Sequence, residues 1–228
     1  LFVDGALSAV GDDTNGPIIF TSIKDDNIGN PTDTNNDGNG SAPGSSDWGA
    51  IVFRSATDDA NSIINNVEVR FGFLGIAMRS ASVPVKNSLI SNSEVWGISM
   101  DGDSSPDIEN VSIEGSGGSP LAVSTLANPT FTDISFDDNG TNGLALIEGH
   151  TSISRKYVSR SNTISNDVTL GVRSIAGFEN VPYIINDRMT VGTNTRLTLN
   201  PGVILKFNGA GIDIDGALIA EGTEQERI

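Results

Sequence analysis

The chain has 228 residues, and its 13 Lys and Arg against 29 Asp and Glu give a formal net charge of -16 at pH 7. A field of this sign repels nucleic acid and anionic lipid and attracts divalent cations. The chain has no Cys, which excludes disulfides and thiolate metal sites, and no stretch approaches the roughly 20 apolar residues of a membrane-spanning helix.

The two ends of the chain carry nearly the same eight residues. Residues 4–11 read DGALSAVG and residues 215–222 read DGALIAEG, which is six matches in eight at an offset of 211. A turn sequence shared by chance or by local duplication would also explain this. We expect instead a module of a tandem array, or like ends that dock on one another. The chain begins at Leu1 without an initiator Met, so we expect a mature or excised piece.

Residues 24–47 form an acidic loop rich in Asn, Asp and Gly, after a strand phrase at residues 17–22. Residues 33–41 read DTNNDGNGS, the first half of a D-x-N-x-D-G calcium loop, in which alternate side chains supply oxygens and Gly permits the sharp turn. Gly44 stands where such a loop has its bidentate Glu. The predicted calcium ligands are therefore Asp33, Asn35, Asp37, Asn39 and Ser41, with Asp25, Asp26 or Asp47 completing the shell.

A solvated loop without a metal is the alternative for this segment. The chain has many Asn, Asp and Gly turns. A polar segment of this length without structure of its own is uncommon, however, unless something orders it or uses it. We therefore predict bound Ca²⁺.

A short apolar phrase recurs through the middle of the chain. It reads GIAM at 75–78, GISM at 97–100, PLAV at 120–123 and GLAL at 143–146, so it returns at a nearly constant interval. A second phrase keeps the same interval and follows Asn87, Asn110 and Asp133. Each phrase is too short for a helix and is bounded by turn formers, so both are predicted strands. Two strands per interval, without room for a crossover helix, predict a parallel β-helix in which each coil packs on its neighbours.

Asn66, Asn87 and Asn110 recur at nearly the same interval as the strands. This spacing predicts a ladder of side-chain amides bonded along the axis, with a structural role.

The interval is lost between residues 148 and 187, which we expect to form an irregular or lateral insertion. This insertion contains the most basic patch of the chain, Arg155, Lys156 and Arg160. It could be a strand pair that leaves the coil, a lateral loop or a contact with a partner. Residues 188–228 restore strand phrases and resemble the start of a next repeat. We therefore predict one module over residues 1–228.

Several phrases together resemble the right-handed parallel β-helix repeat modules of large secreted or surface-attached bacterial proteins. They are LTLNPGVILKF at 197–207, GALIAEGT at 216–223, IIFTS at 18–22, the loop at 33–38 and DWGAI at 47–51. The resemblance implies an all-β, right-handed parallel β-helix located outside the cell or at the cell surface. The spacing of the phrases corresponds to roughly 22–23 residues per coil. The Pro-Gly strand normally comes first in such modules; here it comes last, as expected if a next copy supplies the strands after Ile228.

Parallel β-helices also include polysaccharide lyases and hydrolases. A glycosidase needs two carboxylates about 5 to 10 Å apart across a groove; the candidates are Asp101, Asp103 and Asp107 on one turn, and Asp137 with Asp138 further on. His150 is the only histidine, and no catalytic motif surrounds it. An acidic chain also lacks the cluster of basic residues that a lyase uses. We therefore predict that the chain is not an enzyme.

Carbohydrate binding remains the alternative, although Trp48, Trp96, Tyr157 and Tyr183 are too dispersed to indicate an aromatic platform. We find no amphipathic capping helix at either end, and open strand edges must be capped or paired. We therefore expect a structural or adhesive extracellular module that joins copies of itself head to tail, in a fibre or tandem array, and is stabilised by calcium. Surface polysaccharide is the other partner considered.

Overall fold

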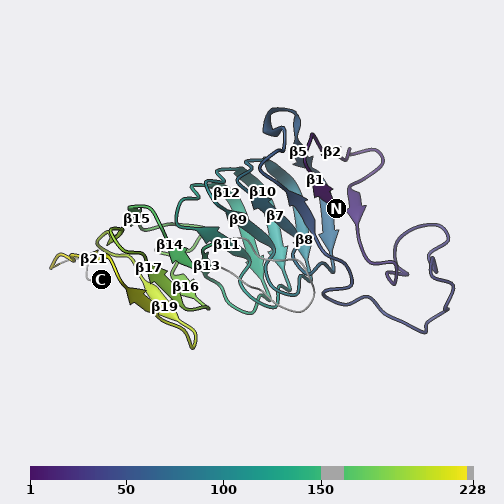
Figure 1. Cartoon of the computed structure of the whole chain (residues 1–228). Helices are drawn as coiled ribbons and strands as arrows, with labels where there is room; N and C mark the ends of the chain where they lie inside the picture. Colours follow the sequence, from purple (N-terminus) through teal and green to yellow (C-terminus); the bar gives the residue numbers. More distant parts are fainter. Residues whose placement is uncertain (150–161, 225–228) are drawn as a thin grey trace.

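The computed structural model describes residues 1–149 and 162–224 as a rod of short strands stacked along one axis. The N-terminal strands lie at one end of the rod and the C-terminal strands at the other (Figure 1). Within these residues, all strand pairs in the four sheets are parallel. In the described chain no helix is long and apolar enough to cross a membrane.

Sheet A runs the full length of the rod. Its strands, in spatial order, are β1 (Phe2–Val3), β4 (Ile51–Phe53), β7 (Ile76–Arg79), β9 (Ile98–Asp101), β11 (Leu121–Ser124), β13 (Leu144–Ile147), β16 (Tyr183–Ile185) and β19 (Leu205–Phe207).

Sheet B covers another side of the N-terminal two thirds. Its strands are β2 (Ser8–Val10), β5 (Ile63–Asn65), β8 (Val85–Ser91), β10 (Asp107–Glu114) and β12 (Thr130–Asp137), with β3 (Ile18–Phe20) paired to β6 (Val67–Arg70) beside them. A 3-10 turn, η1 (Asp59–Asn61), precedes β5.

Two three-stranded sheets complete the C-terminal third. Sheet C contains β14 (Thr163–Ile164), β17 (Met189–Val191) and β20 (Ile212–Ile214). Sheet D contains β15 (Val168–Leu170), β18 (Arg196–Leu199) and β21 (Ala217–Ala220).

The register confirms the predicted repeat. Ile76 pairs with Ile98, Ile98 with Leu121, and Leu121 with Leu144, so strands one coil apart hold equivalent residues side by side. The chain makes about seven turns of about 23 residues each. The all-β parallel β-helix expected from the sequence is therefore the observed fold.

Apolar side chains of equivalent positions form the core. Ile76, Ile98, Leu121 and Leu144 point inward from sheet A and are at most 1% exposed. Inward side chains of sheet B, among them Ile90 and Ile113, pack in the same cluster. Full burial of an Ile or Leu stabilises a fold by about 1.5–3 kcal/mol, so the strand phrases that set the repeat also supply its stability.

Asparagine and aspartate form corners of sheet B between β5 and β6 and within β8, β10 and β12. Asn66, Asn87, Asn110 and Asp133 have φ of 54°, 48°, 52° and 52°, a left-handed conformation that Asn and Asp tolerate better than most residues. The Asn110 amide donates to Asn87 Oδ1, and the Asn87 amide donates to Asn65 Oδ1, both at 2.8 Å. The predicted ladder therefore exists, but its first member is Asn65. Asn66, one position later, forms the corner of the backbone itself.

The coil changes shape after β13. Leu144 pairs with Tyr183, so the chain between these two paired strands is longer than in the preceding coils. Sheet B ends at β12, and sheets C and D begin. The segment 148–187, expected to be irregular, holds β14, β15 and β16, and residues 171–182 contain no strand. His150 and the basic patch of Arg155, Lys156 and Arg160 lie outside the described residues.

The corner ladder generates a stability prediction at Asn110. Asn110→Ala removes the side-chain hydrogen bond to Asn87 and places Ala in the left-handed region. The change costs about 1–2 kcal/mol for the backbone and about 0.5–1.5 kcal/mol for the hydrogen bond. Asn110→Gly removes the same bond but adopts positive φ freely. We expect denaturant unfolding to show a larger loss of stability for Ala than for Gly. Equal losses would mean that the corner backbone carries no strain.

Candidate metal centre

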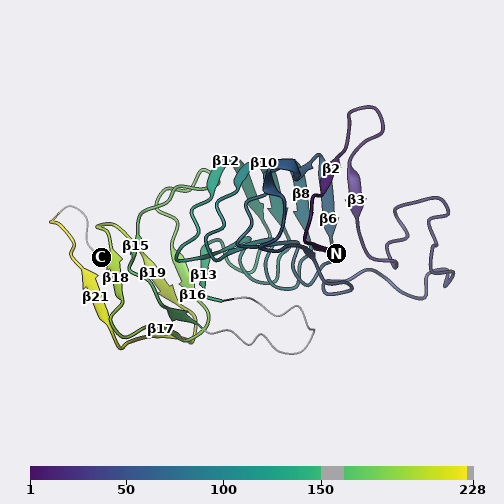
Figure 2. The same ribbon diagram turned by 45° about the horizontal axis from the view of Figure 1, so that its top comes forward.

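The acidic loop connects β3 to β4 and extends past the N-terminal end of the rod (Figures 1 and 2). Asp47 fastens its base, because its carboxylate accepts hydrogen bonds from Ser22 Oγ at 2.6 Å, Lys24 Nζ at 2.6 Å and the Gly44 amide at 3.0 Å. Partial burial disfavours the charged carboxylate, but these bonds outweigh it and hold the pKa of Asp47 below its ordinary value. Asp47 is thus a structural anchor.

Asp25 is a second anchor at the base of the loop. It is buried, accepts from Thr21 Oγ1 at 2.7 Å, and lies 3.7 Å from Arg70 Nη1 on β6. The sequence offered Asp25 and Asp47 as further metal ligands. In the structure the Asp25 carboxylate lies beside Arg70 of the rod, and the Asp47 carboxylate joins the two limbs of the loop through Ser22 and Lys24. Their basic partners, Lys24 and Arg70, were the signal for this role.

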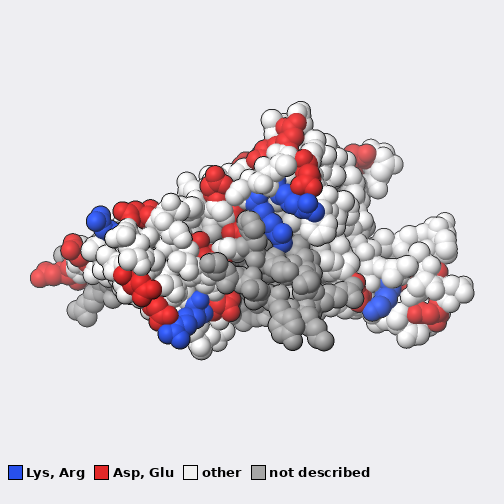
Figure 3. Space-filling view, in the orientation of Figure 1, with Lys and Arg blue, Asp and Glu red and all other residues white. Residues whose placement is uncertain are grey.

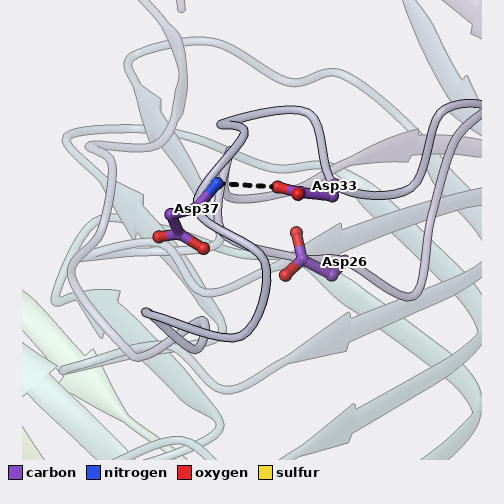
Figure 4. Close-up of side chains that lie close together, drawn as sticks. All are labelled: Asp26, Asp33 and Asp37. Carbon is purple, nitrogen blue, oxygen red and sulfur yellow. Dashed lines mark hydrogen bonds between the residues drawn. The ribbon is translucent and has the colours of Figure 1, made fainter.

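Three carboxylates of the loop come together. Asp26, Asp33 and Asp37 each offer an oxygen within 4.8 Å of the others, and Figure 4 shows the three side chains around a common space. All three were among the predicted ligands. Asp26 comes from the limb that leaves β3, whereas Asp33 and Asp37 come from the turn of the loop, so the cluster joins two parts of it.

Two backbone amides of the turn donate hydrogen bonds to its first residue, Asp33. Asp33 accepts from the backbone amides of Asp37 and Gly38, both at 3.0 Å (Figure 4 draws the first of these). Gly38 has a φ of 69°, which favours glycine at this position. The sequence motif therefore folds locally by placing its first carboxylate under the glycine turn.

The other predicted ligands in the turn are Asn35, Asn39 and Ser41; Asn35 and Ser41 are half-buried beside the cluster, and Asn39 is exposed. The Asn35 amide and the Ser41 hydroxyl both donate to Asp37 Oδ2, at 3.0 and 2.6 Å. These donors orient the Asp37 carboxylate. Asn35 and Ser41 therefore support the cluster through Asp37.

The electrostatics of the cluster favour a cation. Partial desolvation, and then the charges of Asp33, Asp37 and Asp25, raise the pKa of Asp26 above its ordinary value. Asp26 Oδ1 and Asn35 Oδ1 are buried without a hydrogen-bond partner in the described structure, although buried oxygens are normally satisfied. Oxygen ligands in a flexible loop suit Ca²⁺, which takes six to eight of them. The residues present therefore fit a calcium ion, with water supplying further ligands.

The family model of the right handed beta helix region matches residues 47–180 of the chain, which is more than half of it. No curated protein and no solved structure matches the chain.

Calcium is expected to stabilise the protein through this cluster. At a calcium concentration about 100 times the dissociation constant, binding to the folded state alone adds about 2.7 kcal/mol. We expect calcium to raise the melting temperature and Asp33→Asn to abolish the rise. Asp12→Asn is the matched control, because Asp12 also accepts two backbone amides of a turn, from Thr14 and Asn15, but lies outside the cluster. An unchanged response in Asp33→Asn would exclude this site.

The raised pKa of Asp26 gives the calcium affinity a pH dependence. Protons compete with calcium for this carboxylate, so affinity is expected to fall as pH drops through the raised pKa. Without calcium, the stability of the fold changes with pH in the opposite direction. The folded state keeps Asp26 protonated above the ordinary pKa of 3.8, so the contribution of Asp26 to stability decreases as pH rises through its raised pKa. Calorimetric titration with calcium at several pH values, with Asp26→Asn as comparison, measures the pH dependence of the affinity. An equal change of affinity with pH in both proteins would contradict the prediction.

Proposed function

Since the chain belongs to the family of right-handed β-helix regions, we propose that it is a structural module of an extracellular rod, joined end to end to further coils and stabilised by calcium. The proposal is supported first by where apolar side chains are exposed. Of the thirteen large hydrophobic residues that are exposed in the described chain, nine lie on or beside the terminal strands. They are Leu1, Phe2, Val10 and Ile18 at one end, and Ile204, Phe207, Ile214, Leu218 and Ile219 at the other.

The strand edges at the two ends support the same conclusion. Among the described strands, β1, β2 and β3 at the N-terminal end each pair with one strand only, and β19, β20 and β21 at the C-terminal end do the same. Open edges that also expose apolar side chains favour association with another sheet edge. Each end therefore has the features of an interface with more β-helix.

The sides of the rod differ from its ends. Figure 3 shows acidic side chains spread over one side of the rod and on the projecting loop. A net charge of -16 keeps lateral surfaces of neighbouring rods apart. Association along the axis is therefore favoured over lateral aggregation.

Calcium would act at the joint between modules. The acidic loop extends past β1 and β3, in the direction where a preceding module would lie (Figures 1 and 2). An ion held by Asp26, Asp33 and Asp37 would order this loop and reduce its repulsion from an equally acidic neighbour. Extracellular modules bind calcium at the high concentrations found there, which agrees with a cell-surface location of the bacterial type.

The candidate catalytic carboxylates favour a non-enzymatic role. Asp101 ends β9 in sheet A, whereas Asp107 begins β10 and Asp137 ends β12 in sheet B. Hydrogen bonds from Thr130 and Lys86 lower the pKa of Asp107, which makes it a poor proton donor near neutral pH. We therefore propose no hydrolase or lyase activity for these residues.

Glycan binding is a second candidate function, favoured by one groove. The groove follows the bends of sheet B, and its lining includes the amides and hydroxyls of Asn87, Asn110, Ser112 and Ser135 beside the acidic residues Glu68 and Asp133. Equivalent groups recur once per coil, about 4.8 Å apart. A neutral, extended polysaccharide would find repeated hydrogen-bond partners here, and a glycan-binding screen tests it.

End-to-end association is tested by electron microscopy and sedimentation velocity, with calcium and with chelator. We expect axial polymers with calcium and shorter species with chelator. Leu218→Asp, on β21, is expected to reduce the polymers to single modules because it places a charge in the joint. Leu126→Asp is the matched control, since both leucines are 43% exposed but Leu126 lies on the side of the rod. Single modules at high protein concentration with calcium would contradict the proposal, and so would equal effects of the two variants.

A further inference from the structure

Sheet B ends in the middle of the rod, at β12, while sheet A continues past it through β13, β16 and β19 (Figure 1). Among the described strands, β12 pairs with β10 only. The Thr130 amide donates to the Pro106 carbonyl at 3.0 Å, so the amide of the next residue, Phe131, faces the outer edge of β12. An open edge of eight residues is a template for another strand.

The apolar layer of β12 is incompletely covered. Phe131 and Phe136 occupy the register positions of Ile108 and Ile113 on β10, and they pack against the same core cluster. Ile108 and Ile113 are 0% exposed, since β10 has a strand on each side, whereas Phe131 and Phe136 are only half-buried. A strand added on β12 would cover them as β12 covers β10, provided that it has apolar side chains at these two positions.

The corner of β12 has a hydrogen-bond acceptor without a donor among the described residues. In the ladder of sheet B each amide donates to the side-chain oxygen one coil earlier, from Asn110 to Asn87 and from Asn87 to Asn65. Asp133 takes the next place, with a φ of 52°, and its carboxylate only accepts. A strand added on β12 would place its own corner residue over Asp133, where a donor would continue the ladder.

A hairpin beside β12 turns this corner into a pocket. The turn at residues 175–178 has φ of 56° and 73° at its two central positions, as a type I′ turn requires, and backbone hydrogen bonds of 2.9 and 3.1 Å close it. Arg173 fastens the hairpin to the segment before β12, because its guanidinium donates to the carbonyls of Pro129 and Ala127 at 3.3 and 3.5 Å. A cavity of about 470 Å³ lies between the hairpin and β12.

The lining of this cavity combines two phenyl rings with two carboxylates. Phe131 and Phe178 supply the rings, and Asp133 and Glu179 supply the carboxylates. A Lys or Arg side chain matches this combination, since its aliphatic stem packs on apolar surface while its charged head stays beside the carboxylates. A cation over a ring face is attracted as well. An acidic segment would be repelled by these carboxylates and by the net charge of -16.

We infer that the outer edge of β12 binds an extended segment of a partner protein as an added parallel strand. Its Lys or Arg lies over Asp133, and its apolar side chains lie over Phe131 and Phe136. Hydrogen bonds along the backbone of β12 give the affinity, and the cavity gives the specificity. The site lies on the side of the rod, so it does not depend on end-to-end association.

Fluorescence anisotropy of the whole chain with a labelled peptide, TVTKVTVT, tests the inference. In the register of β12 this peptide places Val over Phe131 and Phe136 and Lys over Asp133. We expect saturable binding, and binding weaker by about tenfold or more when the Lys of the peptide is replaced by Glu. No binding of TVTKVTVT, or equal binding of the two peptides, would overturn the inference.

Asp133→Asn is the matching change in the protein. Asn forms the equivalent corners at Asn87 and Asn110, so the fold is kept while the charge is lost, and binding is expected to weaken about tenfold. Asp138→Asn is the control, because Asp138 is exposed and has a φ of 48° but lies outside the cavity. Equal affinities of the two variants would overturn the anchor at Asp133.

Two peptides N-methylated at alternate residues test the strand pairing. One of them lacks every amide that faces β12, and the other lacks the amides that face away. We expect only the first to lose binding, and hydrogen exchange at the Phe131 amide to slow when the unmodified peptide is bound. Equal binding of both methylated peptides would overturn the added strand. Binding of a neutral oligosaccharide at Phe178, without binding of any peptide, would assign the cavity to a glycan and overturn the inference.

Discussion

The parallel pairing of each coil with the one before it is the constraint on which the rest of this structure depends. Its register places like residues on like residues, so Ile76, Ile98 and Leu121 form one apolar column and Asn87 and Asn110 form one corner. Each coil buries its apolar side chains with the help of its neighbours and satisfies its backbone groups through them. Within the described residues, the first and last coils pair with another coil on one side only, and they expose apolar side chains and strand edges.

The same constraint explains where the chain departs from regular coiling. Loops leave the coil between strands, so a long segment can be inserted without disturbing the pairing on either side. The acidic loop does this between β3 and β4: Asp25 pairs with Arg70 of the rod, and Asp47 pairs with Lys24 across the base of the loop. These ion pairs hold the base of the loop, whereas Asp26, Asp33 and Asp37 face one another at its turn. The anchoring carboxylates and the candidate cation cluster are thus separate within one segment.

In the proposed function, the ends of the rod and the acidic loop act together. The loop projects past the strands that a neighbouring module would cover (Figure 2), so an ion in the loop would lie near the joint. Association would then respond to calcium through the order of the loop and through the charge that the ion offsets. The acidic sides of the rod would limit lateral contact under the same conditions.

The sequence by itself determined the coil, because short apolar phrases that return at a regular interval have one way to bury them all. It also located the acidic turn, since Asp33 and Asp37 are close in the chain and Gly38 permits the turn. Only the tertiary structure decided which distant carboxylate joins them. Asp25, Asp26 and Asp47 are alike in sequence, but Arg70 and Lys24 pair with two of them and leave Asp26 in the cluster.

The tertiary structure likewise showed that Asn65 begins the amide ladder. This observation concerns a contact between neighbouring coils. Such contacts depend on strand register to within one residue, and the repeat interval alone does not fix that register because loops of different length enter between the strands.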